Sequence, residues 1–180
     1  MSGKKIVRNA LAALTIGTSL LAHASTPEPI RHSVTIKASQ ADVWQRWTTD
    51  DGLRTFFSRA SNIDLQVGGD YEILFFPDNP PGERGAEGTK IMALEPPYRL
   101  AFDWSAPPAW PEQRVQRTMV EIRLVASGAD TVVILTHAGW GDGKQWQEVR
   151  DYFDVAWVRI LARLNDSFEA GPVNWFLSGN

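Results

Sequence analysis

The order of apolar and polar positions predicts one strand, two short helices, about six further strands and a long final helix. Ile30 to Lys37 alternates, with Ile30 and Ile36 among the side chains of one face, as is typical of a strand. Residues 40–48 place apolar side chains at spacings of three and four, which predicts a helix. Ser39 is a suitable N-cap for that helix. A second short helix is expected over residues 53–57.

The middle of the chain has the pattern of strands joined by turns. Residues 63–67 and 70–76 alternate on either side of Gly68-Gly69, which predicts a hairpin. Two proline-rich loops, residues 77–85 and 105–114, separate parts of this region. Successive strands with short connections favour an antiparallel meander. The further strands are expected at residues 89–94, 99–104, 116–125 and 131–137.

The last element is the clearest. From Trp146 to Phe168 the apolar residues follow one another at steps of one, three or four, which predicts an amphipathic helix of about six turns, begun near Asp142 and ended at Gly171-Pro172. Because a curved sheet needs an apolar partner, we expect an α+β fold in which an antiparallel sheet of about six to seven strands wraps around this helix and leaves a space between them. The polar face of the helix carries Glu148, Arg150, Asp151, Asp154, Arg159, Arg163 and Asp166.

The first 24 residues have the layout of a secretory signal peptide. Basic residues at the start precede an apolar stretch from Ala10 to Leu21, and Ala22-His23-Ala24 forms an A-x-A cleavage pattern. We therefore expect cleavage after Ala24, a periplasmic or secreted location, and a domain over residues 25–180 with its core at about 30–168. The apolar stretch is too short to span a bilayer comfortably, so no stable membrane insertion is expected after cleavage. The alternatives are an uncleaved anchor or a buried N-terminal helix.

Composition narrows the function classes. The chain has no cysteine, which excludes disulfides. Removal of the three basic residues of segment 1–24 leaves 15 Lys/Arg against 21 Asp/Glu, a net charge of −6. An acidic domain without a basic run is a poor nucleic-acid binder. The eight tryptophans suit a wide core or an aromatic-lined pocket.

Several short motifs, in order over about residues 30–166, resemble one family. They are Val43-Trp44 with Asp50, Leu53 and Phe56-Phe57; residues 67–71; residues 87–100; residues 102–104; residues 131–139; and Ala156-Trp157 with Leu161 and Leu164. Together they resemble the heat-shock protein 90 ATPase activator homologues, a branch of the START-like (SRPBCC) superfamily. The resemblance implies the helix-grip fold. It implies function poorly, because the superfamily hosts lipid carriers, receptors, cyclases and co-chaperones. Ala156 replaces the family's glycine, which implies a narrower cavity beside Trp157.

His137 is the candidate residue for catalysis or for a polar contact to a ligand. The alternation of its strand places it on the inward face, where an imidazole could bind a ligand or act as general acid or base. The alternative is a structural histidine bonded to a loop carbonyl. Tyr71, Glu72 and Thr136 are the nearest candidate partners. His32 is also expected to point inward, but two histidines without a carboxylate do not make a metal site, and we expect no metal or cofactor.

The aromatic side chains fit either a plain core or a lined cavity. We expect an exported protein that binds a small hydrophobic molecule, with the two proline-rich loops as lids and with Trp110 and Arg114 as gate residues. One alternative is an enzyme, such as a cyclase or hydrolase, that uses His137 on a hydrophobic substrate; another is a co-chaperone-like interaction domain. The sequence makes no prediction of oligomeric state. The expected ligand-binding set is Trp44, Trp47, Phe57, Tyr71, Phe75, Phe102, Trp104, Trp110, His137, Phe153 and Trp157.

Overall fold

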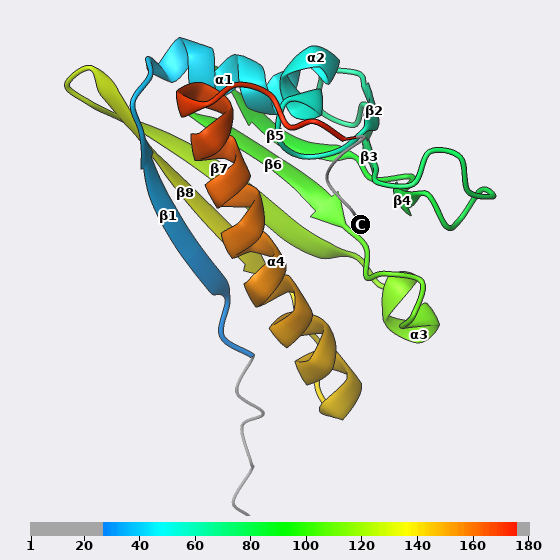
Figure 1. Cartoon of the computed structure of the whole chain (residues 1–180). Coiled ribbons are helices and arrows are strands. Elements are labelled where there is room, and N and C mark those ends of the chain that lie inside the picture. The colour runs from blue at the N-terminus through cyan, green and yellow to red at the C-terminus, as the bar shows by residue number, and fades with distance from the viewer. Residues whose placement is uncertain (1–26, 176–180) are drawn as a thin grey trace, which may run out of the picture.

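The computed structural model describes residues 27–175, and its centre is a long helix lying across one face of a curved antiparallel sheet (Figure 1). The expected signal peptide, residues 1–24, lies outside the described residues. The elements in chain order are β1 (Ile30–Ile36), α1 (Gln40–Thr48), α2 (Asp50–Arg54), β2 (Ala60–Ile63), β3 (Tyr71–Leu74), β4 (Gly85–Ala86), β5 (Ile91–Glu95), β6 (Arg99–Trp104), α3 (Pro111–Arg114), β7 (Thr118–Ser127), β8 (Asp130–Ala138) and α4 (Lys144–Glu169).

The sheet that faces α4 has five antiparallel strands in the order β1-β8-β7-β6-β5. The register sets His137 of β8 opposite both Ile30 of β1 and Val120 of β7. A smaller sheet, β2-β3-β4, stands beside it, and a bridge between Asp70 and Lys90 is one of the backbone contacts that connect the two. The α+β helix-grip fold is therefore confirmed, with its strands divided between a five-stranded and a three-stranded sheet rather than joined in one.

Helix α4 holds the fold together through its apolar face. Trp157, Leu161 and Leu164 are buried against the sheet, as their spacing predicts. Burial of a large apolar side chain contributes roughly 1.5–3 kcal/mol, so this face is a major source of stability. The helix begins near Asp142, as expected: its N-cap is the next residue, Gly143, whose φ of 98° favours glycine, and no side chain caps this end.

The two short helices begin where hydroxyl groups cap them. The amide of Asp42 donates to Ser39 Oγ at the start of α1, as predicted. Helix α2 covers Asp50–Arg54 instead of residues 53–57, because Thr49 Oγ1 accepts the amide of Gly52 at 2.9 Å and starts the helix earlier. The two helices meet closely at Gly52, where a Cβ would lie 2.2 Å from the carbonyl oxygen of Gln45.

The predicted hairpin exists, but its strands are shorter and displaced. Strand β2 ends at Ile63, and residues 64–70 form a loop before β3. The backbone at Gly68-Gly69 bonds to the start of β5 instead of making a tight turn: Gly68 N donates to Ile91 O at 2.7 Å, and Ile91 N donates to Gly69 O at 2.9 Å. These bonds hold the small sheet against the large one.

The end of the described chain folds back over α2 (Figure 1). Val173 N donates to Thr55 O at 2.9 Å, and the indole N–H of Trp175 donates to Arg54 O at 2.6 Å. Trp175 is thereby placed beside the C-terminal half of α4, where the Arg163 guanidinium lies 5.5 Å from its ring centroid. Between residues 27 and 175, no helix is both long and apolar enough to cross a membrane.

Candidate functional site

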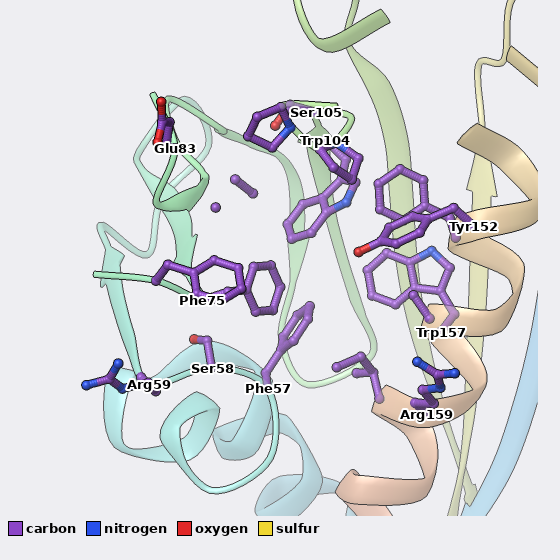
Figure 2. Close-up of a pocket in the computed structure, with 18 of the residues that line it drawn as sticks. Phe57, Ser58, Arg59, Phe75, Glu83, Trp104, Ser105, Tyr152, Trp157 and Arg159 are labelled. Carbon is purple, nitrogen blue, oxygen red and sulfur yellow. The ribbon is translucent and has the colours of Figure 1, made fainter. Parts of the chain in front are cut away.

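A pocket of about 630 Å3 opens between α4, the end of β6, the loop from β3 to β4 and the segment after α2. Figure 2 shows Phe57 and Phe75 on one side of it and Tyr152 and Trp157 of α4 on the other, with Trp104 between them. A volume of this size is in the range of pockets that hold a small organic molecule. A hollow therefore lies beside α4, and Phe57, Trp104 and Trp157, which are almost fully buried, form its floor.

Aromatic rings in mutual contact form the walls of this pocket. Phe57 is at their centre, because its ring stacks on Trp104 at 6.0 Å between centroids and meets Trp157 edge-on at 5.8 Å. Phe75 meets Phe57 in an edge-on arrangement with 5.9 Å between ring centroids. Stacked and edge-on aromatic pairs contribute about 0.5–1.5 kcal/mol each beyond their buried area, so the walls are held in place without a ligand.

The two proline-rich loops lie at the pocket, as predicted, and Arg114 joins them. Its guanidinium donates to Ala106 O at 2.6 Å in the second loop. It also donates to Gly82 O at 2.9 Å and to Gly85 O at 2.7 Å at the end of the first. Arg114 lines the pocket, but its three hydrogen bonds to carbonyl oxygens also connect the two loops. Trp110 does not line the pocket; its ring packs on Tyr152 at 5.6 Å.

The charged side chains around the pocket differ in how they are neutralised. Arg59 forms an ion pair with Asp78 at 3.2 Å and points away from the cavity in Figure 2. Arg159 and Arg163, one turn apart on α4, both line the pocket, and no carboxylate between residues 27 and 175 pairs with either of them. Glu83 lies on the opposite side of the pocket from Arg159 (Figure 2).

Two polar atoms in the pocket-lining residues are without a protein partner. Trp104 Nε1 and Ser105 Oγ are buried and make no hydrogen bond with any described residue. An unpaired buried polar group costs about 1–3 kcal/mol, so such groups call for an explanation. Their position in the pocket wall marks a place where a bound molecule could supply the missing partner.

His137 is buried behind the pocket and does not line it. Its Nε2 lies 2.8 Å from Thr118 Oγ1, and its Nδ1 accepts the indole N–H of Trp157 at 2.9 Å. Burial lowers the pKa of His137 to about 3, so the ring is neutral at ordinary pH. Both ring nitrogens are occupied and no acid contacts them, which gives His137 a structural part in the fold.

Two of the three partners proposed for His137 on sequence grounds, Tyr71 and Glu72, are engaged elsewhere, and Thr136 alternates to the other face of β8. Tyr71 donates its hydroxyl proton to Trp47 O at 2.7 Å. Glu72 accepts the amide of Gly88 at 2.6 Å. Thr118, which is the actual partner of His137, was not among the candidates, because its side chain reaches the imidazole across the β7–β8 pairing. His32 faces α4 as expected and lies 2.8 Å from Asp154, at the edge of the sheet and away from the pocket.

The eleven predicted ligand-binding residues fall into two groups. Five line the pocket: Phe57, Phe75, Trp104, Phe153 and Trp157. The other six are Trp44, Trp47, Tyr71, Phe102, Trp110 and His137, which belong to the core or pack against it. Alternation and helical spacing place a side chain on the inner face, but they do not tell how far along that face the cavity extends.

The sequence analysis missed several lining residues. Arg159 and Arg163 were placed on the polar face of α4 without a role in the pocket, yet both border the pocket, because the sheet covers only part of the helix circumference. The sequence did offer a signal: the two arginines are four residues apart and flank Ile160, which is buried and also lines the pocket. Phe76, Tyr152 and Trp175 were missed as well. In the described part of the chain, no three His, Asp or Glu side chains gather as a metal site would require.

One known protein family matches most of this chain. The family model described as activator of Hsp90 ATPase homolog 1-like protein matches residues 37–169. The search among curated proteins found no match.

Solved structures share the fold at low sequence identity. The solution structure of the Aha1 dimer from Colwellia psychrerythraea is 23% identical, with a TM-score of 0.62, and the match covers 81% of this chain and 98% of that one. The crystal structure of CalU16 from Micromonospora echinospora is 23% identical, with a TM-score of 0.60, over 83% of this chain and 78% of that one. Protein MLL2253 from Mesorhizobium loti is 14% identical, with a TM-score of 0.65, over 81% and 100%. At these identities the likeness concerns the fold.

Proposed function

This chain belongs to the family of activator of Hsp90 ATPase homolog 1-like proteins, and on that fold we propose that it binds a small hydrophobic molecule in the pocket between α4 and the sheets. The observation that carries the proposal is the open pocket of about 630 Å3 with walls of Phe57, Trp104 and Trp157. Mostly apolar pockets with a few polar groups are the usual form of a small-molecule site.

The polar groups of the pocket wall support the same proposal. Trp104 Nε1 and Ser105 Oγ have no partner within the described chain, although both are buried. Unpaired polar groups reduce stability, and two of the three such side-chain atoms in the described residues lie in this wall, the third being Trp47 Nε1 in the core. A ligand with a hydrogen-bonding group would complete them.

A direct test uses N-phenyl-1-naphthylamine, a neutral aromatic probe that fluoresces strongly in apolar surroundings. Ala156 lines the pocket on α4 and is half-buried, whereas Ala162 lies exposed on the same helix. We expect saturable binding to the protein, a large loss of affinity in Ala156→Phe, which fills the pocket, and unchanged affinity in Ala162→Phe. Equal binding by all three proteins would place the probe elsewhere and refute the proposal.

The alternative of an enzyme that uses His137 receives no support from the geometry of the site. The imidazole does not line the pocket, both of its nitrogens are bonded to protein groups, and its pKa of about 3 keeps it unprotonated. A general acid–base needs to reach the substrate within hydrogen-bond distance. A co-chaperone role would follow from the family name alone, and no feature of the described surface argues for it.

Export from the cytoplasm is part of the same proposal and rests on segment 1–24. The three regions of a signal peptide occur there in order, ending in Ala22-His23-Ala24. We expect the intact mass of the protein from the periplasmic or extracellular fraction to correspond to a chain that begins at Ser25. Replacement of Ala24 by Arg should block cleavage. An unprocessed chain in the cytoplasmic fraction would refute export and leave the binding proposal untouched.

A further inference from the structure

The pocket has a charged border that its apolar walls do not explain. Arg159 and Arg163 line it from α4, at a spacing of four residues that puts them one above the other on the helix. Arg159 makes no hydrogen bond, ion pair or ring contact with any residue of the described chain. Arg163 likewise makes no hydrogen bond or ion pair there, and its guanidinium lies over the ring of Trp175. Other arginines of the pocket differ, because Arg59 pairs with Asp78 and Arg114 is bonded to three carbonyl groups.

Two unpaired guanidinium groups beside an aromatic cavity are suited to an anion. A guanidinium offers five N–H donors in a planar fork that matches a carboxylate, and its charge is fixed at any physiological pH. Trp175 lies against Arg163, and its own N–H is tied to Arg54 O, so this arginine is held at the pocket border. The acidic side chain that lines the pocket, Glu83, lies on the far side from Arg159 (Figure 2), where it does not neutralise the pair.

Resting on the binding function proposed above, we infer that the ligand is an amphipathic anion. Its apolar part lies against Phe57, Trp104 and Trp157, and its anionic group, a carboxylate in the simplest case, lies at Arg159 and Arg163. The positive charge of this pair differs from the net charge of the protein, which is acidic with 21 Asp/Glu against 18 Lys/Arg. General attraction for anions is therefore weak, and selectivity for one has to come from the local pair.

A matched pair of probes separates charge from apolar binding. N-phenyl-1-naphthylamine and 8-anilinonaphthalene-1-sulfonate share the same aromatic body, and the second adds one sulfonate, which is ionised at every pH used. Fluorescence titration of both probes with the purified protein gives the ratio of their dissociation constants. We expect the sulfonate to bind about tenfold more tightly than the neutral probe at low ionic strength, and this preference to shrink as salt is added.

Three variants assign that preference to residues. Arg159→Gln leaves the contact between Arg163 and Trp175 in place and should weaken sulfonate binding about fivefold relative to binding of the neutral probe. The double variant Arg159→Gln/Arg163→Gln should remove most of the preference. Arg31→Gln, on the exposed side of β1, is the control with the same loss of charge and should have no effect.

The outcomes distinguish this inference from the binding proposal. If the neutral probe binds in the pocket but the double variant keeps its full preference for the sulfonate, the arginine pair does not select the ligand and the inference is overturned. The same holds if Arg31→Gln lowers the preference as much as Arg159→Gln does. If neither probe is sensitive to Ala156→Phe, the binding proposal itself fails.

Discussion

The indole N–H of Trp157 on α4 donates a hydrogen bond to Nδ1 of His137 on β8, with 2.9 Å between the two nitrogens. An indole N–H can only donate, so Nδ1 carries no proton and the proton of the neutral imidazole is on Nε2. Nε2 then donates to Thr118 Oγ1, which in turn donates to Trp104 O at 3.2 Å. One chain of hydrogen bonds thus links the helix to β8, β7 and β6.

The first prediction concerns Trp157, where this series of hydrogen bonds begins. Trp157→Phe removes the donor, leaves Nδ1 of His137 unsatisfied in the core and opens a small cavity. We expect it to lower the free energy of unfolding by about 2–4 kcal/mol, measured by urea denaturation. Trp110→Phe is the control, because Trp110 is half-buried and outside the hydrogen-bond chain, and it should cost less than about 1 kcal/mol. A Trp157→Phe variant as stable as the control would contradict the account.

The second prediction follows from the pKa of His137, which burial lowers to about 3 from an ordinary value of 6.5. Below pH 6.5 the unfolded chain takes up a proton at this site before the folded chain does, so stability is full above that pH and falls as the pH decreases. The slope approaches about 1.4 kcal/mol per pH unit, which gives a loss of about 2 kcal/mol between pH 7.5 and 5.

Urea denaturation at several pH values checks this slope. His137→Asn lowers stability at neutral pH but removes the titrating group, so its free energy of unfolding should fall by about 2 kcal/mol less than that of the unchanged protein over the same interval. Parallel pH profiles for the two proteins would show that His137 is not the source of the dependence.

Local patterns determined most of the fold in advance. Helix α1 and strand β6 have the predicted bounds, because Ser39 caps one and the alternation of Arg99–Trp104 is unbroken in the other. Errors arose where longer-range bonds decided the structure. Gly68-Gly69 was read as a tight turn, but its backbone pairs with Ile91, which is remote in sequence. Helix α3 was missed within the second proline-rich loop, although Pro111 occupies its first turn.

The existence of a pocket could be predicted from the sequence, but the full set of residues that line it could not. Periodicity identified Phe57, Trp104 and Trp157 as inward-facing, and all three line the pocket. It gave the same reading for Tyr71 and Phe102, which fill the core; their ring centroids lie 4.4 Å apart. Arg159 could not be assigned because a helical pattern has one polar face, and only the position of the sheet divides that face into solvent and pocket border.

A third prediction concerns the hydrogen bonds by which Arg114 connects the two proline-rich loops. Arg114→Met keeps much of the side-chain volume but loses the bonds to Ala106 O, Gly82 O and Gly85 O. We expect faster hydrogen–deuterium exchange in residues 77–86 and 105–114 and a loss of about 1–3 kcal/mol in stability. Arg123→Met is the control, since Arg123 is exposed and bonds only to Glu121, so it should cost less than about 1 kcal/mol and leave both loops protected. Unchanged exchange in Arg114→Met would refute this connecting role.

A fourth prediction separates core from pocket. Tyr71→Phe removes the bond to the buried carbonyl of Trp47 and should cost about 1–3 kcal/mol of stability while leaving probe affinity unchanged. Phe75→Ala removes a lining ring and should weaken binding of N-phenyl-1-naphthylamine severalfold. The two readouts are a thermal or urea unfolding curve and a fluorescence titration. Loss of affinity in Tyr71→Phe with unchanged affinity in Phe75→Ala would place the site elsewhere.

The most direct test of ligand binding in this pocket is a titration of the 15N-labelled protein with N-phenyl-1-naphthylamine, followed through the indole N–H signals in NMR spectra. The account predicts that the signals of Trp104, Trp157 and Trp175, which line the pocket, shift with saturation, while that of Trp47 in the closed core stays in place. Shifts confined to indoles outside the pocket, or no shift at concentrations that saturate the fluorescence change, would contradict it.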